Sequence, residues 1–328
     1  MATTVGYLLS QHPTNPVDDP RYETDTKKGW AKRFEPISRV KVHTSVQDGI
    51  VLADFDSALG REQADDTVRQ QLGAYPPNYR HWRLETESDA KNWFHHEISS
   101  VVLAAWAQHP NVIQQSEAKA FSDSTIAEVA DDAYTIKPAS QMRTPLVIGE
   151  FKRGLIQPPQ WQRGDIDTSR QLTLSRELRG YAHKYECPQI FCFDGRTLLM
   201  LQFRARKLKH VAEADCEVDC WVIPRENEGG CTLRYALYRL LVQGLRRCQG
   251  KLALSNVTLY GQSPKFRQFY SGEPIWDVEG KLYRQPWDCY RVIDPSNGAF
   301  YWMCREEEVQ DQDGNRMWDT QGIYKAPS

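Results

Sequence analysis

The chain has 328 residues, enough to bury the core of one elaborated domain or of two small ones. Its composition, 40% hydrophobic and 26% charged with 10 Trp and 15 Tyr, is typical of a soluble globular protein and excludes a disordered chain. The formal net charge of −2 excludes a protein that binds nucleic acid through overall positive charge, so such a partner would need a local basic patch.

The sequence indicates a protein of the cytoplasm or the nucleus. Residues 1–16 lack the basic segment and the long apolar run of a secretory signal. No apolar run approaches the length that spans a membrane, so we expect no membrane partner. In these reducing compartments we expect the eight cysteines to be free thiols.

Two terminal additions to a central core are predicted. Residues 1–87, rich in Pro, Asp, Arg and Gln, are expected to pack on the core, with a strand at 49–54 and a helix over 61–72. Residues 256–328 are expected to form a β-rich extension. Its hairpin signals are the turn dipeptides Glu279-Gly280 and Asp313-Gly314.

The core is predicted over residues 88–255. It begins with a helix over 89–109, with Ser88 as its N-cap and Pro110 as its stop. The elements expected after it are strands at 119–121, 133–136 and 146–151, a helix at 169–186, strands at 189–193, 198–203 and 219–224, and a helix at 232–251. This mixture predicts an α/β fold in which helices flank a mixed sheet.

The residues Glu150 and Lys152 end an apolar strand and form the most informative motif of the chain. Side chains alternate along a strand, so these two share one face while Phe151 points to the other. If Asp132 begins the neighbouring strand, its carboxylate lies beside Glu150; Asp131 takes that place if the strand begins one residue earlier. Two carboxylates in one cleft need a cation, and their hard oxygen atoms favour Mg²⁺ or Mn²⁺. Lys152 is then placed to act on a water molecule or on a phosphate.

This set of elements resembles the PD-(D/E)XK nuclease superfamily. The resemblance covers about residues 89–204: a helix, an Asp at a strand start, an apolar strand that ends in Glu-x-Lys, and a following helix. It implies a restriction-endonuclease-like core. It also implies that Asp132 and Glu150 bind the metal and that Lys152 acts on the attacking water.

The same resemblance points to two helical residues. An acid on the first core helix often joins the metal site in this superfamily, which implies that Glu97 is a further metal ligand. Glu97 lies on or beside the apolar stripe of its helix, so the alternative is an acid at the edge of that stripe that reaches solvent. Several members use a polar residue on the helix after Glu-x-Lys. Gln171 is our candidate, although the Gln-x-x-x-Tyr spacing of some branches is absent.

Basic residues indicate where a nucleic acid would bind. Residues 150–210 contain twelve Lys or Arg against six Asp or Glu, and every charged residue of the predicted helix at 232–251 is basic. We expect phosphate contacts from Arg153, Arg176, Arg179, Arg234, Arg239, Arg246 and Arg247. The alternative is that these arginines belong to solvated helix faces, because a count of charges carries no geometry.

Three functions stay open on the sequence. The first is metal-dependent phosphodiester hydrolysis, with Mg²⁺ or Mn²⁺ as cofactor and a nucleic acid as partner. The second follows from the stretches at 149–156 and 175–205, which look like fungal members of the superfamily, and from fungal arginine-containing cyclodipeptide synthases, intracellular enzymes of similar size. Such an enzyme would bind aminoacyl-tRNA, and Glu97, Asp132 or Glu150 would recognise the arginine side chain. The third is a catalytically silent module that binds RNA or protein.

Overall fold

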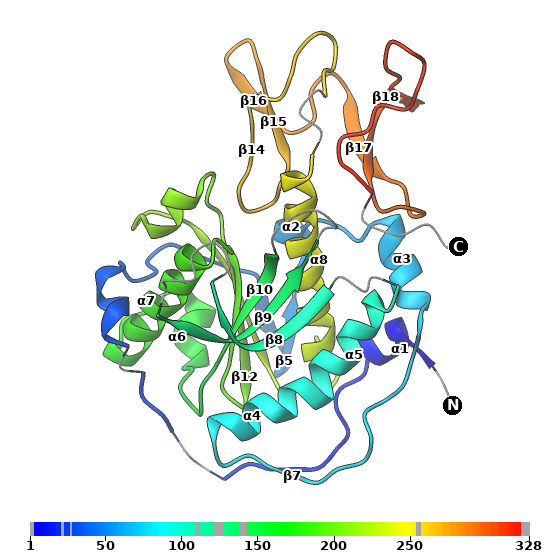
Figure 1. Cartoon of the computed structure of the whole chain (residues 1–328). Coiled ribbons are helices and arrows are strands. Elements are labelled where there is room, and N and C mark those ends of the chain that lie inside the picture. Colours follow the sequence, from blue (N-terminus) through cyan, green and yellow to red (C-terminus); the bar gives the residue numbers. More distant parts are fainter. Residues whose placement is uncertain are drawn as a thin grey trace.

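The structure of the chain is a computed structural model (Figure 1). It describes residues 3–20, 23–26, 28–108, 112–120, 127–137, 143–253 and 257–322. One large sheet with helices around it forms the body of the molecule, and the C-terminal strands extend from one end of it (Figure 1). None of the described helices is both long and apolar enough to cross a membrane.

The large sheet has seven strands. In spatial order they are β3 (Val40–Val42), β13 (Val218–Pro224), β12 (Thr197–Phe203), β11 (Gln189–Phe193), β10 (Thr144–Phe151), β9 (Val129–Ile136) and β8 (Val112–Lys119). The pairs β10–β11 and β13–β3 are parallel and the other pairs are antiparallel. The sheet is therefore mixed, as predicted. The strand expected at 119–121 is instead β8, which ends at Lys119, and residue 121 lies outside the described part.

The first of the helices that flank this sheet changes along its length from α-helix to a π-helical turn, back to α-helix and then to a 3₁₀ turn. In order they are α4 (Glu87–Phe94), a π-helical turn η2 (His95–Ser99), α5 (Ser100–Leu103), the 3₁₀ turn η3 (Ala104–Trp106), α6 (Pro158–Arg163), α7 (Ser169–Lys184) and α8 (Leu233–Lys251). The predicted N-cap Ser88 is wrong: Thr86 caps α4 by accepting from the N–H of Asp89, whose carboxylate accepts from the N–H of Thr86. The predicted end at His109 and Pro110 lies outside the described residues.

The two faces of the sheet belong to separate cores. Phe151 and Phe193 pack in the core that includes residues of α4 and α8. Ile148 and Cys192 pack in the core that includes residues of α6 and α7. Each central strand therefore sends alternate side chains into different layers. This arrangement confirms the predicted α/β fold with a mixed sheet between helices.

The N-terminal residues wrap around the core and also contribute to the sheet, because β3 forms its edge. Their elements are β1 (Thr3–Thr4), α1 (Val5–Leu9), β2 (Val17–Asp18), the 3₁₀ turn η1 (Gly29–Arg33), β4 (Thr44–Gln47), β5 (Ile50–Ala53), α2 (Asp56–Leu59), α3 (Ala64–Gln71), β6 (Gly73–Ala74) and β7 (Trp82–Arg83). The turn η1 lies against α7. The turn η1 and the helix α7, which are far apart in sequence, are thus in contact.

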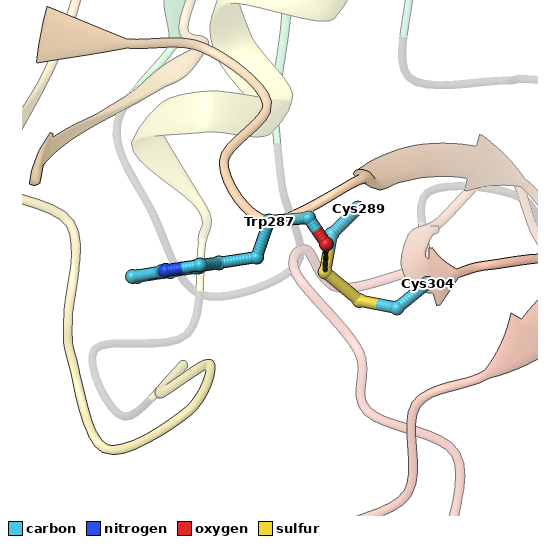
Figure 2. Close-up of a disulfide and its surroundings, with 3 residues drawn as sticks. All are labelled: Trp287, Cys289 and Cys304. Atoms are coloured by element: carbon cyan, nitrogen blue, oxygen red, sulfur yellow. Dashed lines mark hydrogen bonds between the residues drawn. A yellow bond between two sulfur atoms is a disulfide. The ribbon is translucent and has the colours of Figure 1, made fainter.

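The C-terminal region forms two small antiparallel sheets (Figure 1). Their strands are β14 (Phe266–Arg267), β15 (Pro274–Val278), β16 (Lys281–Tyr283), β17 (Cys289–Ile293), β18 (Phe300–Cys304) and β19 (Glu307–Glu308). A disulfide joins Cys289 to Cys304 across the β17–β18 pair, with Trp287 next to it (Figure 2). The prediction that all cysteines are free thiols is therefore wrong for these two.

Candidate active site

The side chains of Glu150 and Lys152 lie at the end of β10 on the same face of the sheet, as predicted. The ammonium group of Lys152 forms an ion pair with Oε1 of Glu150, and the two side chains are only 6% and 1% exposed. Phe151 points to the other face, where its ring centroid is 5.8 Å from that of His95. The alternation predicted for this strand is confirmed.

The carboxylate of Asp132 lies on the opposite face from Glu150. Asp132 is paired with Gly149 of the antiparallel strand β10, and directly paired residues share a face. Glu150, the neighbour of Gly149, therefore points away from Asp132. Asp132 instead lies 3.0 Å from Nε2 of His95 and accepts a hydrogen bond of 2.9 Å from Gln114. The expectation that Asp132 and Glu150 share a metal ion is wrong, because strand alternation separates them.

The acid on the same face as Glu150 is Asp131, the alternative that the sequence left open. Oδ2 of Asp131 accepts a 2.8 Å hydrogen bond from the backbone N–H of Phe151. Burial is the main cause of the raised pKa of Glu150, and the nearby negative charge of Asp131 adds to it. The role that the superfamily resemblance implied for Asp132 therefore fits Asp131 better.

Two residues that were not predicted complete this group of charges. Glu177 of α7 has Oε1 at 3.4 Å from the ammonium group of Lys152. Lys28, from the N-terminal residues, places its ammonium group 2.9 Å from Oε1 of Glu150 and 3.0 Å from Oε1 of Glu177. Lys28 is 33% exposed, whereas the side chains of Glu150 and Glu177 are at most 1% exposed. We call Lys28, Asp131, Glu150, Lys152 and Glu177 the acid–lysine cluster.

The phenol of Tyr181 borders the acid–lysine cluster. Its oxygen accepts a 2.5 Å hydrogen bond from Lys28 and donates one of 3.0 Å to the carbonyl of Val129. Glu177 and Tyr181 are four residues apart on α7, so they lie on the same face of the helix. This is the spacing of the Gln-x-x-x-Tyr pattern with Glu in place of Gln. A search that allowed this substitution would have found both residues.

Burial and neighbouring charges set the protonation of the acid–lysine cluster. Burial raises the pKa of Glu150 to about 8, although Lys152 and Lys28 favour its ionised form. Burial also opposes the charge of Glu177, but Lys152 and Lys28 outweigh this effect and lower its pKa. Burial disfavours both ammonium groups, yet the two glutamates raise the pKa of Lys28 and of Lys152. Both lysines are therefore charged near neutral pH, and the charge of Glu150 depends on nearby cations.

The predicted metal ligand Glu97 is placed apart from the acid–lysine cluster. Its Oε1 accepts hydrogen bonds of 2.7 Å from Asn15 and 2.8 Å from the indole N–H of Trp82, and lies 3.0 Å from Nδ1 of His96. Its backbone carbonyl accepts a 2.7 Å bond from Arg234. These contacts tie the π-helical turn to the N-terminal residues and to α8. The expected metal-binding role of Glu97 has no support in this geometry, and the alternative of a solvent-exposed acid is also wrong, because Glu97 is 1% exposed.

The amide of Gln171 makes three local hydrogen bonds. Its oxygen accepts from the N–H of Gln157 at 3.2 Å and from the indole of Trp161 at 2.7 Å, and its nitrogen donates to the carbonyl of Leu155 at 2.8 Å. Gln171 therefore holds the loop after β10 against α7. It does not reach the acid–lysine cluster, so its predicted catalytic role is replaced by a structural one.

Most of the arginines that were expected to contact phosphate point inward. The buried ones are Arg153, Arg179, Arg234, Arg239 and Arg247 by residue exposure, together with Arg246, whose side chain is 10% exposed. Their guanidinium groups bond to backbone carbonyls or to acids: Arg153 to Asp19 and to the carbonyl of Pro20, for example. Arg176, like Arg246, is half-buried. The donors of these six hold the fold together, which does not support the predicted phosphate-binding surface, although Arg239 and Arg246 also line a cavity.

The acid–lysine cluster has the donor atoms that a divalent metal prefers. Oε2 of Glu150 is buried and has no hydrogen-bond partner among the described residues. The carboxylates of Glu150 and Glu177 already hold a cation, the ammonium group of Lys28. In the described part of the chain, no three His, Cys, Asp or Glu side chains are grouped closely enough to hold a metal ion as they stand. A metal at Glu150 and Glu177 would therefore require that Lys28 move away and that the surrounding acids come closer together.

Comparison with known proteins gives no relative that would help to interpret this geometry. The chain was compared with protein-family models, with curated proteins and with solved structures, and no match was found.

Proposed function

We propose that this chain is a PD-(D/E)XK-type enzyme that hydrolyses phosphodiester bonds in a nucleic acid with Mg²⁺ or Mn²⁺. The observation that carries the proposal is the convergence of Asp131, Glu150 and Lys152 with Glu177 of the next long helix in one cluster, in which all but Asp131 are buried. The order of elements also supports it: a helix, three antiparallel strands, a crossover helix, and then β11 parallel to β10.

The residues have separate roles in this proposal. Asp131, Glu150 and Glu177 would hold the metal, which when bound supplies a Lewis acid and lowers the pKa of a bound water molecule. Lys152 stays protonated because the two glutamates raise its pKa. It therefore serves as a hydrogen-bond donor that stabilises negative charge on a phosphate oxygen, and not as a general base.

The proposal is tested by cleavage of labelled single- and double-stranded DNA and RNA in the presence of Mn²⁺ or Mg²⁺. Wild-type protein is expected to cleave at least one of these substrates, and Glu150→Gln and Lys152→Met to lose that activity while circular dichroism shows an unchanged fold. Absence of metal-dependent cleavage by the wild-type protein, with Mn²⁺ binding demonstrated, would contradict the proposal and favour a silent RNA- or protein-binding module.

A second candidate is a tRNA-dependent synthase of arginine-containing cyclic dipeptides. One observation favours it: the carboxylates of Glu150 and Glu177 accommodate the cationic end of a side chain, that of Lys28. A substrate arginine would need such an acidic recess. Detection of a cyclic dipeptide by mass spectrometry of a host that expresses the protein would support this function. Its absence, with metal-dependent cleavage in vitro, would support the first.

A further inference from the structure

A segment of the N-terminal residues is built onto α7 beside the acid–lysine cluster. We call residues 23–26 and 28–37 the strap. At its start, the N–H of Thr24 donates to the carbonyl of Arg153 at 2.8 Å, and the N–H of Arg153 donates back to Oγ1 of Thr24 at 3.0 Å. Thr26 donates to the carboxylate of Glu177. At its end, the N–H of Ile37 donates to Oγ of Ser175 at 3.2 Å. Contacts at both ends therefore fix the position of Lys28 between them.

The missing side chain of Gly180 leaves space on the surface of α7, and residues of the strap occupy it. Gly180 lies within this helix, where glycine costs about 0.5–1 kcal/mol relative to alanine. A Cβ atom at this position would lie 2.3 Å from the ring of Trp30 and 3.0 Å from that of Phe34. The Trp30 ring also packs 5.1 Å from that of Tyr181. The absence of a side chain at Gly180 thus allows the strap to lie close to α7.

The lysine of the strap occupies the most accessible position of the acid–lysine cluster. Its ammonium group contacts Glu150, Glu177 and Tyr181 within 3.0 Å. The side chain of Lys152, the other cation, is only 6% exposed, against 33% for Lys28. An external cation that approaches the two glutamates must therefore take the place of Lys28.

We propose that the strap is an internal competitor for a divalent cation: Lys28 occupies the carboxyl groups of Glu150 and Glu177 in the closed state, and a metal binds when the strap moves away. This inference rests on the proposed function, because it assigns the metal to the same carboxylates. A divalent cation and an ammonium group at one pair of carboxylates repel each other, so metal and Lys28 exclude each other. Metal affinity is then reduced by the fraction of molecules in the closed state.

Lys28→Gln removes the competing charge and keeps a side chain of similar length. We expect the full-length variant to bind Mn²⁺ about tenfold or more tightly than the wild type in isothermal titration calorimetry, because a unit charge in contact with both glutamates is lost. The matched control is Lys32→Gln, which removes an exposed lysine from the same strap. Its affinity is expected to equal that of the wild type. Equal affinities for wild type and Lys28→Gln would overturn the inference.

Gly180→Ala tests the strap without altering any charge. Alanine favours the helix, so α7 is expected to stay folded while the new methyl group displaces Trp30. We expect tighter Mn²⁺ binding and faster limited proteolysis by trypsin at Lys28, Lys32 and Arg33. Faster proteolysis with unchanged Mn²⁺ affinity would contradict the competition, because the strap would then have moved without effect on the metal.

The outcomes separate this inference from the proposed function. In one outcome, the wild type binds Mn²⁺ and cleaves nucleic acid, and both Lys28→Gln and Gly180→Ala bind Mn²⁺ as tightly as the wild type. The inference then fails and the function stands. If both variants bind Mn²⁺ more tightly but no variant cleaves any nucleic acid, the competition stands and the function fails. If no variant binds Mn²⁺, both are wrong.

Discussion

The two faces of the large sheet carry buried acids in different surroundings. On the face of α7, Asp131 and Glu150 lie with Glu177 and two lysines. On the other face, Asp132 is held by His95 and Gln114. Asp131 and Asp132 are neighbours in sequence, yet only one of them belongs to the acid–lysine cluster. The comparison shows that the phase of a strand, and not the spacing of a motif, decides which acid can take part in chemistry.

The faces also differ in how their acids are neutralised. The acid–lysine cluster contains two ammonium groups, and one of them, that of Lys28, is partly exposed. Asp132 has a histidine, an amide and the phenol of Tyr134 as side-chain partners, and its Oδ1 has no hydrogen-bond partner among the described residues. At the acid–lysine cluster, another cation could therefore replace the ammonium group of Lys28. Asp132, by contrast, is part of the packing between β9 and the first helix.

The largest effect is expected from the motif residues themselves. Lys152→Met removes the donor that stabilises charge on the phosphate, which is expected to lower kcat about 10²–10³-fold. Glu150→Gln removes a metal ligand and is expected to lower it at least as much. Single-turnover cleavage assays with Mn²⁺ measure both, with circular dichroism as the control of folding. Retention of wild-type rates in either variant would place the chemistry elsewhere.

A direct comparison of the two faces uses the neighbouring variants Asp131→Asn and Asp132→Asn. Asp131→Asn is expected to lower Mn²⁺ affinity about 10–100-fold, the range found when a group that supports a metal site is removed. Asp132→Asn is expected to leave Mn²⁺ affinity unchanged and to lower the free energy of unfolding by about 1–3 kcal/mol, because His95 loses a charged partner. Loss of metal binding in Asp132→Asn alone would reverse our assignment of the faces.

Glu97, on the first helix, further tests the distinction between acids of the candidate site and acids with a structural role. Glu97→Gln replaces an acceptor of two hydrogen bonds, from Asn15 and Trp82, and is expected to lower the free energy of unfolding by about 1–3 kcal/mol. Urea denaturation measures this loss. The cleavage rate at a temperature where the variant is folded should equal that of the wild type. A fold of normal stability with lost cleavage would restore Glu97 to the site.

A further effect is expected from pH. The pKa of Glu150 is about 8, so below this pH a proton must leave before the carboxylate can bind a metal. Mn²⁺ affinity is therefore expected to rise about tenfold per pH unit up to about pH 8 and to level off above it, with release of one proton per metal bound. Calorimetry in buffers of different ionisation enthalpy measures the proton count. An affinity that does not change between pH 6 and 8 would contradict this account.

The local features of the fold could be predicted from the sequence. The apolar run that ends in Glu150-Phe-Lys152 predicted the alternation of β10, and the strands predicted at 189–193 and 198–203 are β11 and β12. The helix predicted at 169–186 is α7. These elements follow from patterns within a few residues, where period and turn chemistry are sufficient.

The features that depend on tertiary contacts could not be predicted in the same way. Register between β9 and β10 decides between Asp131 and Asp132, and a shift of one residue reverses the faces. Lys28 lies 122 residues before Glu150, and no local pattern joins them. The arginines of α8 looked like a basic face, but their partners Asp56, Asp65 and the carbonyl of Glu97 come from other elements. Charge counts cannot show whether a guanidinium group faces solvent.

The central claim is that Glu150 and Glu177, with Asp131 beside them, form a cation site on the face of α7. The most direct test is a crystal structure of the Lys28→Gln variant soaked with Mn²⁺, with the ion located by its anomalous scattering. We predict one strong peak within coordination distance of the carboxylates of both Glu150 and Glu177. A peak at Asp132, or none at the two glutamates in crystals saturated with Mn²⁺, would contradict the claim.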